Sequence, residues 1–144
     1  MFADFLKRLT APAPTQLPET DARLALTALL VRVARTDGEY DADEKARIDT
    51  ITATRYELDA AAVTSLRNNA EQLETEAPDT VRFTRAIKDT VAYDDRVDVI
   101  EALWQVALAD GERTDDEDTV LRLVSHLLGV SDRDSALARQ RVTS

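Results

Sequence analysis

The sequence predicts an all-α protein, and three observations lead to that prediction. Apolar residues recur at intervals of three and four along most of the chain, which is the period of an amphipathic helix. No segment alternates apolar and polar residues as a half-buried strand would. The 144 residues include only three glycines, and this length suits one domain with a sizeable core. We therefore expect about seven helices packed in a single domain.

The first 18 residues are expected to form a short amphipathic turn and a proline-rich linker, and residues 19–144 a single helical domain. One face of the turn carries four apolar side chains, namely Phe2, Phe5, Leu6 and Leu9. Two alternatives exist for that face: docking on the domain's own core, or contact with a partner or a membrane surface. The prolines at positions 12, 14 and 18 should keep the linker extended.

Seven stretches combine helical periodicity with residues that start or stop helices. The expected helices span residues 19–36, 42–55, 60–77, 80–91, 96–108 and 115–128, with a last helix from a cap at Ser131 to about residue 139. Asp41 and Asp59 are expected as further N-caps, and Gly129 as a C-terminal glycine cap. Residues 93–95 are expected to form a turn, and residues 142–144 to fray.

The helix expected from residue 96 has the strongest apolar pattern and carries the chain's one tryptophan. Its pattern consists of Val97, Ile100, Leu103, Trp104, Ala107 and Leu108. We expect this helix to be the centre of the core.

An acidic stretch occurs twice, at an offset of 73 residues. Residues 37–44 read Asp-Gly-Glu-Tyr-Asp-Ala-Asp-Glu, and residues 110–117 read Asp-Gly-Glu-Arg-Thr-Asp-Asp-Glu. Apolar positions on both sides also correspond, among them Leu30 with Leu103, Ile48 with Leu121 and Ile51 with Val124. This pattern predicts an internal pseudo-twofold repeat of a helix–acidic turn–helix unit.

Two interpretations of the acidic turns remain open. Asp41-x-x-Glu44 and Thr114-x-x-Glu117 each fit a capping box at a helix start, which is a purely structural role. Capping does not explain Asp37 and Asp110, because a carboxylate is disfavoured at the C-terminal end of a helix. Either the amides of the following helix or a bound cation would have to compensate.

The cation interpretation predicts one shared metal site. If the two turns meet in the fold, its ligands are Asp37, Glu44, Asp110 and Glu117. Carboxylates without cysteine or clustered histidine select hard cations, which here means Ca²⁺, Mg²⁺ or Mn²⁺. The spacing of the acids is not that of an EF-hand.

Charge and composition limit the partners. The formal net charge is −10, which repels nucleic acid and anionic membranes and suits cations or basic protein surfaces. We therefore expect a protein partner, which can itself be membrane-associated, and no nucleic acid. No apolar run approaches the roughly 18 residues of a membrane span. The absence of cysteine excludes disulfides and thiolate chemistry, and it fits a cytoplasmic location.

Catalytic motifs are missing from the sequence. The single histidine, His126, is expected to be exposed near a helix C-terminus, on the face opposite Leu123. No serine has a histidine at a motif spacing, and the three glycines are too isolated to form a phosphate-binding loop. We therefore expect no enzyme activity.

The two acidic turns, with the helices that flank them, resemble the tellurite-resistance TerB family. The first copy reads Val33-Ala34-Arg35-Thr36-Asp37-Gly38-Glu39, and the second reads Leu103-Trp104-Gln105-Val106-Ala107-Leu108-Ala109-Asp110-Gly111-Glu112. The resemblance spans about residues 20–140. It implies a helical domain with internal pseudo-symmetry, acidic residues associated with metal binding, and a role in stress response or as an interaction module. Thr114 departs from the pattern, since analogy with Asp41 leads one to expect an acid there.

Two functions follow from these observations. The first is a non-catalytic cytoplasmic stress-response module, similar to tellurite-resistance proteins, that binds a divalent cation through its acidic turns. The alternative is an acidic protein–protein interaction adaptor with no metal requirement.

Overall fold

The computed structural model describes residues 6–7, 19–36, 40–77, 79–109 and 115–143, and these residues form an all-α fold. The helices are α2 (Glu19–Thr36), α3 (Ala42–Tyr56), α4 (Ala60–Glu76), α5 (Thr80–Thr90), α6 (Tyr93–Ala109), α7 (Asp115–Leu127) and α8 (Asp132–Thr143). No strand occurs within these ranges, so the predicted fold class is confirmed there. None of the helices in the described ranges is both long and apolar enough to cross a membrane.

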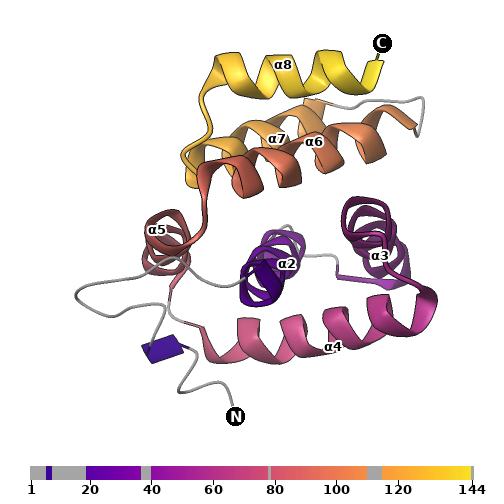
Figure 1. The fold of residues 1–144 in the computed structure, drawn as a ribbon, viewed down its shortest axis with the longest axis vertical. Helices are drawn as coiled ribbons and strands as arrows, with labels where there is room; N and C mark the ends of the chain where they lie inside the picture. Colours follow the sequence, from indigo (N-terminus) through magenta and orange to yellow (C-terminus); the bar gives the residue numbers. More distant parts are fainter. Residues whose placement is uncertain (1–5, 8–18, 37–39, 78, 110–114, 144) are drawn as a thin grey trace.

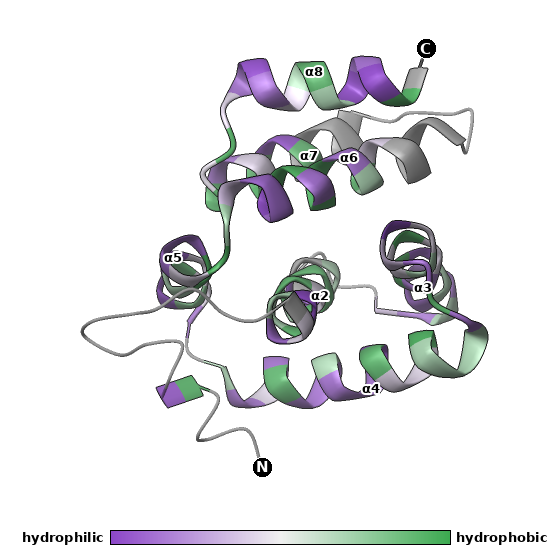
Figure 2. Ribbon diagram, viewed as in Figure 1, coloured by the Kyte–Doolittle hydropathy of each residue, from purple (hydrophilic) through white to green (hydrophobic). Residues whose placement is uncertain are grey.

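Helix α2 lies in the middle of the molecule, with α3 and α5 on either side, α4 across one face, and α6, α7 and α8 on the other (Figure 1). It packs most extensively on α4 and also contacts α3, α5 and α6. On the far side, α6 packs most extensively on α8. Hydrophobic and hydrophilic residues alternate along α4 in Figure 2, as expected for a helix with one buried face.

The centre of the core is α2, and the prediction that it would be α6 is wrong. Leu26, Leu29 and Val31 of α2 are at most 2% exposed, and Ala25 and Ala28 are fully buried. In α6, Ile100 is fully buried, but Val97, Leu103 and Trp104 are only partly buried against the core. The side chains of Ala107 and Leu108 lie outside the described residues. Helix α2 is buried at every position from 25 to 31, on all its sides, whereas the stripe on α6 is only partly buried where it is described.

Helix boundaries lie within one residue of the prediction except at two places. Helix α6 begins at Tyr93, where a turn was predicted, and it takes Asp94 and Asp95 into its first turn. Carboxylates are favoured there by the partial positive charge of a helix N-terminus. Helix α8 continues to Thr143, where fraying was predicted, and its last turn carries Arg141, a favourable charge at a helix C-terminus.

The predicted caps account for most of the other boundaries. The Asp41 carboxylate accepts a hydrogen bond from the amide of Glu44 at 3.0 Å, and Asp59 accepts from the amide of Ala62 at 2.8 Å. The Ser131 hydroxyl accepts from the amide of Asp134 at 3.1 Å.

Gly129 ends α7 in the left-handed conformation, with φ of 68°. The amide of Val130 donates to the carbonyl of Ser125, and the amide of Gly129 to that of His126. This pair of bonds is a Schellman motif, so the predicted glycine cap is confirmed.

The boundaries of the two helical hairpins keep the offset seen in the sequence. Helices α2 and α6 end at Thr36 and Ala109, and α3 and α7 begin at Ala42 and Asp115, so that both pairs are 73 residues apart. The helix after each hairpin packs back on its first helix, α4 on α2 and α8 on α6. The pseudo-twofold relation itself stays a prediction.

Little of the N-terminal segment lies within the described residues. Leu6 is partly buried and packs against the core, which agrees with the docking alternative for that residue. Phe2, Phe5, Leu9 and the prolines of the linker lie outside the described residues.

Candidate functional site

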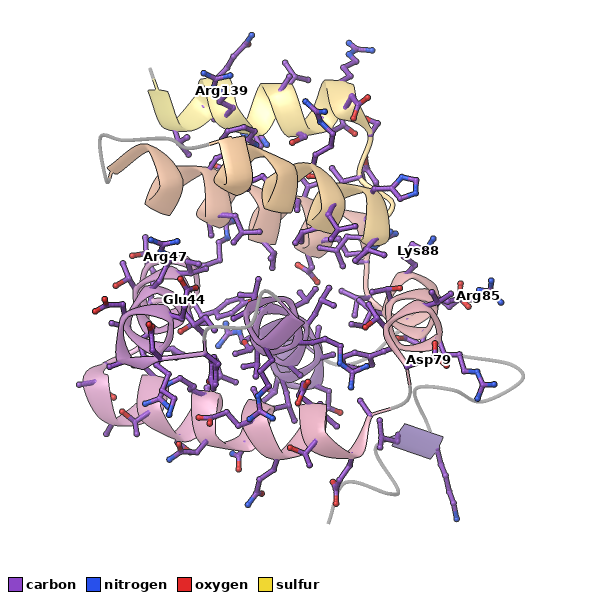
Figure 3. All side chains as sticks on the ribbon, turned by 180° about the vertical axis from the view of Figure 1, so that it is seen from behind. Glu44, Arg47, Asp79, Arg85, Lys88 and Arg139 are labelled. Carbon is purple, nitrogen blue, oxygen red and sulfur yellow. The ribbon has the colours of Figure 1, made fainter. Side chains whose placement is uncertain are left out.

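The predicted metal ligands are only partly within the described residues. Asp37 and Asp110 lie outside them, and Glu117 belongs to α7 but its side chain is not described. Glu44, in the first turn of α3, has a side chain that is 32% exposed, and its carboxylate lies 3.8 Å from the Arg47 guanidinium (Figure 3). Within the described ranges, no group of three or more potential ligands could hold a metal ion. The four-carboxylate site therefore stays a prediction.

The start of α3 explains part of the first acidic turn without an ion. The carboxylate of Asp41 is engaged as the N-cap through its bond from the Glu44 amide. Asp43 and Glu44 occupy the first helical turn, where the helix dipole favours acidic side chains. The structural interpretation is thus confirmed for Asp41, while its counterpart Thr114 lies outside the described residues.

Tyr40 anchors the end of the first acidic turn. Its ring contacts two cations, with the Arg35 guanidinium carbon and the Lys45 ammonium each 5.2 Å from the ring centroid. Burial raises the pKa of Tyr40, the charge of Glu71 raises it further, and Arg67 acts in the opposite direction. The tyrosine therefore links the end of α2 to the first turns of α3. Sequence reasoning missed this contact, because an isolated tyrosine after an acidic run carries no periodic signal.

A second set of interactions, centred on Glu74, joins α2 to α4. The Glu74 carboxylate, 10% exposed, accepts from Arg32 Nε at 3.3 Å and lies 3.2 Å from Arg35 Nη1. Arg32 Nη2 also donates to the backbone carbonyl of Glu74 at 3.0 Å.

Arg67 makes the corresponding link between α3 and α4. It donates to Asp49 and to Glu71, at 2.8 Å in each case. Burial alone would lower the pKa of Arg67, but hydrogen bonds and charges from the two carboxylates outweigh burial and raise it. The sequence contains a signal for these ion pairs of α4: the charged residues at positions 67, 71 and 74 are spaced four and three residues apart, on one face of the helix.

A polar cavity of about 240 Å³ lies where α2, the end of α3 and the start of α6 meet. Its lining includes Arg23, Arg55, Tyr56, Glu57, Asp95 and Asp98. Arg55 pairs with Asp98 at 2.8 Å, and the Arg23 guanidinium lies 4.8 Å from the Tyr56 ring centroid. Burial raises the pKa of Tyr56 above its ordinary value. These charges neutralise one another across the helix junction, which indicates a structural role.

The C-terminal end of α7 exposes His126, as predicted. His126 lines a shallow surface hollow with Arg122, Leu123, Val130, Ser131 and Asp132. Leu123 is 46% exposed and shares this face with His126, so the prediction that it lies on the opposite, inner face is wrong. Leu121, Val124 and Leu128 take the inner positions instead, at intervals of three and four residues.

A family model described as tellurite resistance protein TerB matches residues 23–140. The chain belongs to the TerB family. The matched region of this TerB domain begins in α2, ends in α8 and contains both acidic turns. No curated protein and no solved structure gives a significant match. Family membership confirms the resemblance seen in the sequence and indicates a tellurite-resistance-like stress module.

Proposed function

We propose that this TerB domain is a non-catalytic cytoplasmic stress-response module that binds a divalent cation through its two acidic turns. The proposed ligands are Asp37, Glu44, Asp110 and Glu117, and the proposed ion is Ca²⁺, Mg²⁺ or Mn²⁺. The observation that carries the proposal is the recurrence of the acidic stretch at equivalent helix boundaries. An aspartate follows the last residue of both α2 and α6, Thr36 and Ala109.

The electrostatics of those positions favour a cation. The C-terminal end of a helix carries a partial negative charge, so an aspartate directly after it is disfavoured by about 0.3–1 kcal/mol. A nearby divalent ion would reverse that cost, and carboxylate oxygens are the ligands such ions prefer. Glu44 is suited to take part, because its side chain is 32% exposed at the start of α3 and its carboxylate can be reached from solvent.

The test is calorimetric titration of Ca²⁺, Mg²⁺ and Mn²⁺ into chelator-treated protein. Wild type should bind at least one of the ions, and Asp110→Asn should bind it much more weakly. Asp43→Asn is the matched control, because it removes the same charge from an exposed position in the first turn of α3, outside the proposed ligand set. Absence of binding heat for all three ions, or equal losses in the two variants, would contradict the cation site.

The second candidate function is an acidic protein–protein interaction adaptor with no metal requirement. The N-cap at Asp41 favours it, because that bond gives part of the first turn a structural role without any ion. In this case the exposed carboxylates would meet a basic surface of a partner protein, and the net charge of −10 would speed their encounter. Binding to such a partner should be unchanged by chelator, whereas the cation module should lose its ion-dependent interactions.

A further inference from the structure

Helix α5 carries two cationic side chains, Arg85 and Lys88, that pair with no carboxylate among the described residues. The chain has 28 acidic and 18 basic residues, so a basic side chain has many potential partners. Several arginines elsewhere are paired with carboxylates, as Arg55 is with Asp98 and Arg141 with Glu101. Arg85 and Lys88 of α5, in contrast, make no ion pair, hydrogen bond or ring contact with any residue in the described ranges.

These cations lie on one outward face. Arg82, Arg85 and Lys88 follow one another at intervals of three residues, and all three are exposed. Figure 3 shows Arg85 and Lys88 projecting away from α2. The opposite face of α5 is fixed in the core through Phe83 and Ile87, which are fully buried, so the helix presents the cations from a rigid support.

Two acidic residues border this face. Asp79 caps α5 and lies 3.3 Å from Arg82, which it partly neutralises. Asp89 is exposed near the helix end, where its charge acts on Arg96. Arg85 and Lys88 therefore remain as the cations available to a partner.

The face continues onto the corner between α7 and α8. The stem of Lys88 runs so close to Gly129 that a methyl group at that glycine would lie 2.9 Å from Lys88 Cδ. The next residue, Val130, lines the hollow that Arg122, Leu123 and His126 also form, with Ser131 and the acidic Asp132 at its edge toward α8. Leu123 at 46% exposure, and Val81 at 62% exposure on α5, add apolar surface beside the cations. We call the surface formed by Val81, Arg85, Lys88, Arg122, Leu123 and His126 the α5–α7 basic surface.

We propose that the α5–α7 basic surface docks an acidic amphipathic segment of a partner protein. The cations fit its carboxylates, and Val81 and Leu123 fit apolar residues of the same segment. A short segment is favoured over nucleic acid or an anionic membrane. Nucleic acid or a membrane is large enough to approach the rest of the molecule as well, and the net charge of −10 would repel it. A short segment stays on the basic surface, and charges farther than about 8 Å from it are largely screened.

The test uses a fluorescein-labelled peptide of about 20 residues, rich in glutamate and with leucine at every third or fourth position. Its binding is followed by fluorescence anisotropy in the presence of chelator, so that the result does not depend on the proposed cation. We expect saturable binding to wild type that weakens with added salt. The double variant Arg85→Glu/Lys88→Glu should bind at least about tenfold more weakly.

The matched control is Arg47→Glu/Arg139→Glu, which reverses the same number of charges on α3 and α8 (Figure 3). It should bind the peptide within about twofold of wild type, and Leu123→Ser should weaken binding without changing the net charge. Arg85→Gln/Lys88→Gln, which adds no negative charge, serves if the reversed variant fails to fold, and it should also weaken binding. Failure of the peptide to bind, equal losses in the two double variants, or tighter binding of phosphatidylserine vesicles or DNA would overturn the proposal.

Discussion

At the scale of single residues, Asp41 is the clearest link between sequence pattern and structure. Its carboxylate holds the Glu44 amide at the start of α3, and Asp59 does the same for α4. Asp41→Ala should therefore lower the free energy of unfolding by about 0.5–2 kcal/mol in urea denaturation. Asp43→Ala, two residues later, removes the same charge but no cap, so it should cost less.

The equivalent position in the second hairpin extends this prediction. Thr114→Asp should be nearly neutral, because threonine and aspartate both cap helices. A large gain in ion affinity on making Thr114→Asp would mean that this position is a ligand site and that its assignment as a cap is wrong.

Trp104 has a smaller structural role than the sequence suggests. Its ring is only partly buried, its indole N–H donates to the Ser135 hydroxyl at 3.1 Å, and the Arg139 guanidinium lies 5.2 Å from the ring. Trp104→Ala should therefore cost about 2 kcal/mol, below the roughly 3–5 kcal/mol of a fully buried tryptophan. Urea unfolding followed by far-ultraviolet circular dichroism measures this. Trp104→Phe should cost about 1 kcal/mol, and a loss above about 4 kcal/mol for alanine would place the ring inside a closed core.

Tyr56 should make the fold sensitive to alkali. Burial raises its pKa above the value of about 10 expected in the unfolded chain, and the charge of Arg23 only partly offsets this. The unfolded state therefore loses the phenol proton first as the pH rises. The contribution of Tyr56 is fully present below pH of about 10 and is lost above it, by at most about 1.4 kcal/mol per pH unit. Tyr56→Phe should flatten the decline between pH 9 and about 11 relative to Tyr93→Phe, and parallel curves would contradict the prediction.

At the scale of elements, the junction of α2 with α4 depends on one carboxylate. Glu74 is buried, and its carboxylate is held by Arg32 and Arg35. Glu74→Ala should cost about 3 kcal/mol in urea unfolding, because it leaves the Arg32 charge nearly buried without its carboxylate. Glu71→Ala is the control and should cost about 1 kcal/mol or less, since Arg67 keeps Asp49.

A double variant separates loss of charge from loss of packing at this junction. Arg32→Met/Glu74→Met removes both charges and keeps the volume, so it should be more stable than Glu74→Ala. If the double variant is the less stable of the two, the pair of Arg32 and Glu74 contributes to the stability of the junction in addition to neutralising a buried charge.

The positions of the helices could be predicted because each boundary is a local event. Asp41, Asp59 and Gly129 form their caps with residues at most five positions away, so the sequence contains all the information required. The identity of the central helix could not be predicted in this way. Both α2 and α6 are rich in apolar residues and each packs on four other helices, so what makes α2 the centre is the burial of every residue from Ala25 to Val31.

The candidate site was harder to predict for a different physical reason. Aspartate and glutamate at a helix start serve equally as caps and as cation ligands, so residue type alone does not separate the two roles. Asp41 and Glu44 illustrate this, since Asp41 is a helix cap in the structure and Glu44, three residues later, is partly exposed. The link from Arg32 to Glu74 spans 42 residues, and neither partner belongs to a recognisable motif.

At the scale of the whole molecule, net charge affects every measurement of cation binding. A chain of net charge −10 repels itself, so sodium chloride alone should raise the melting temperature by screening. A bound divalent ion acts in addition to screening and should stabilise the fold by about 2.7 kcal/mol at a hundredfold excess over its dissociation constant. The comparison must therefore be made at matched ionic strength.

We expect at least one of CaCl₂, MgCl₂ and MnCl₂ to raise the melting temperature above that in sodium chloride of equal ionic strength. Asp110→Asn should keep the response to sodium chloride, because screening depends on net charge, and should lose most of the additional gain. The metal-free variant should melt close to wild type, since asparagine preserves the shape of aspartate and still accepts hydrogen bonds. If the three divalent salts only match sodium chloride, the acidic turns hold no specific ion, and their carboxylates are helix caps on a surface that binds a partner.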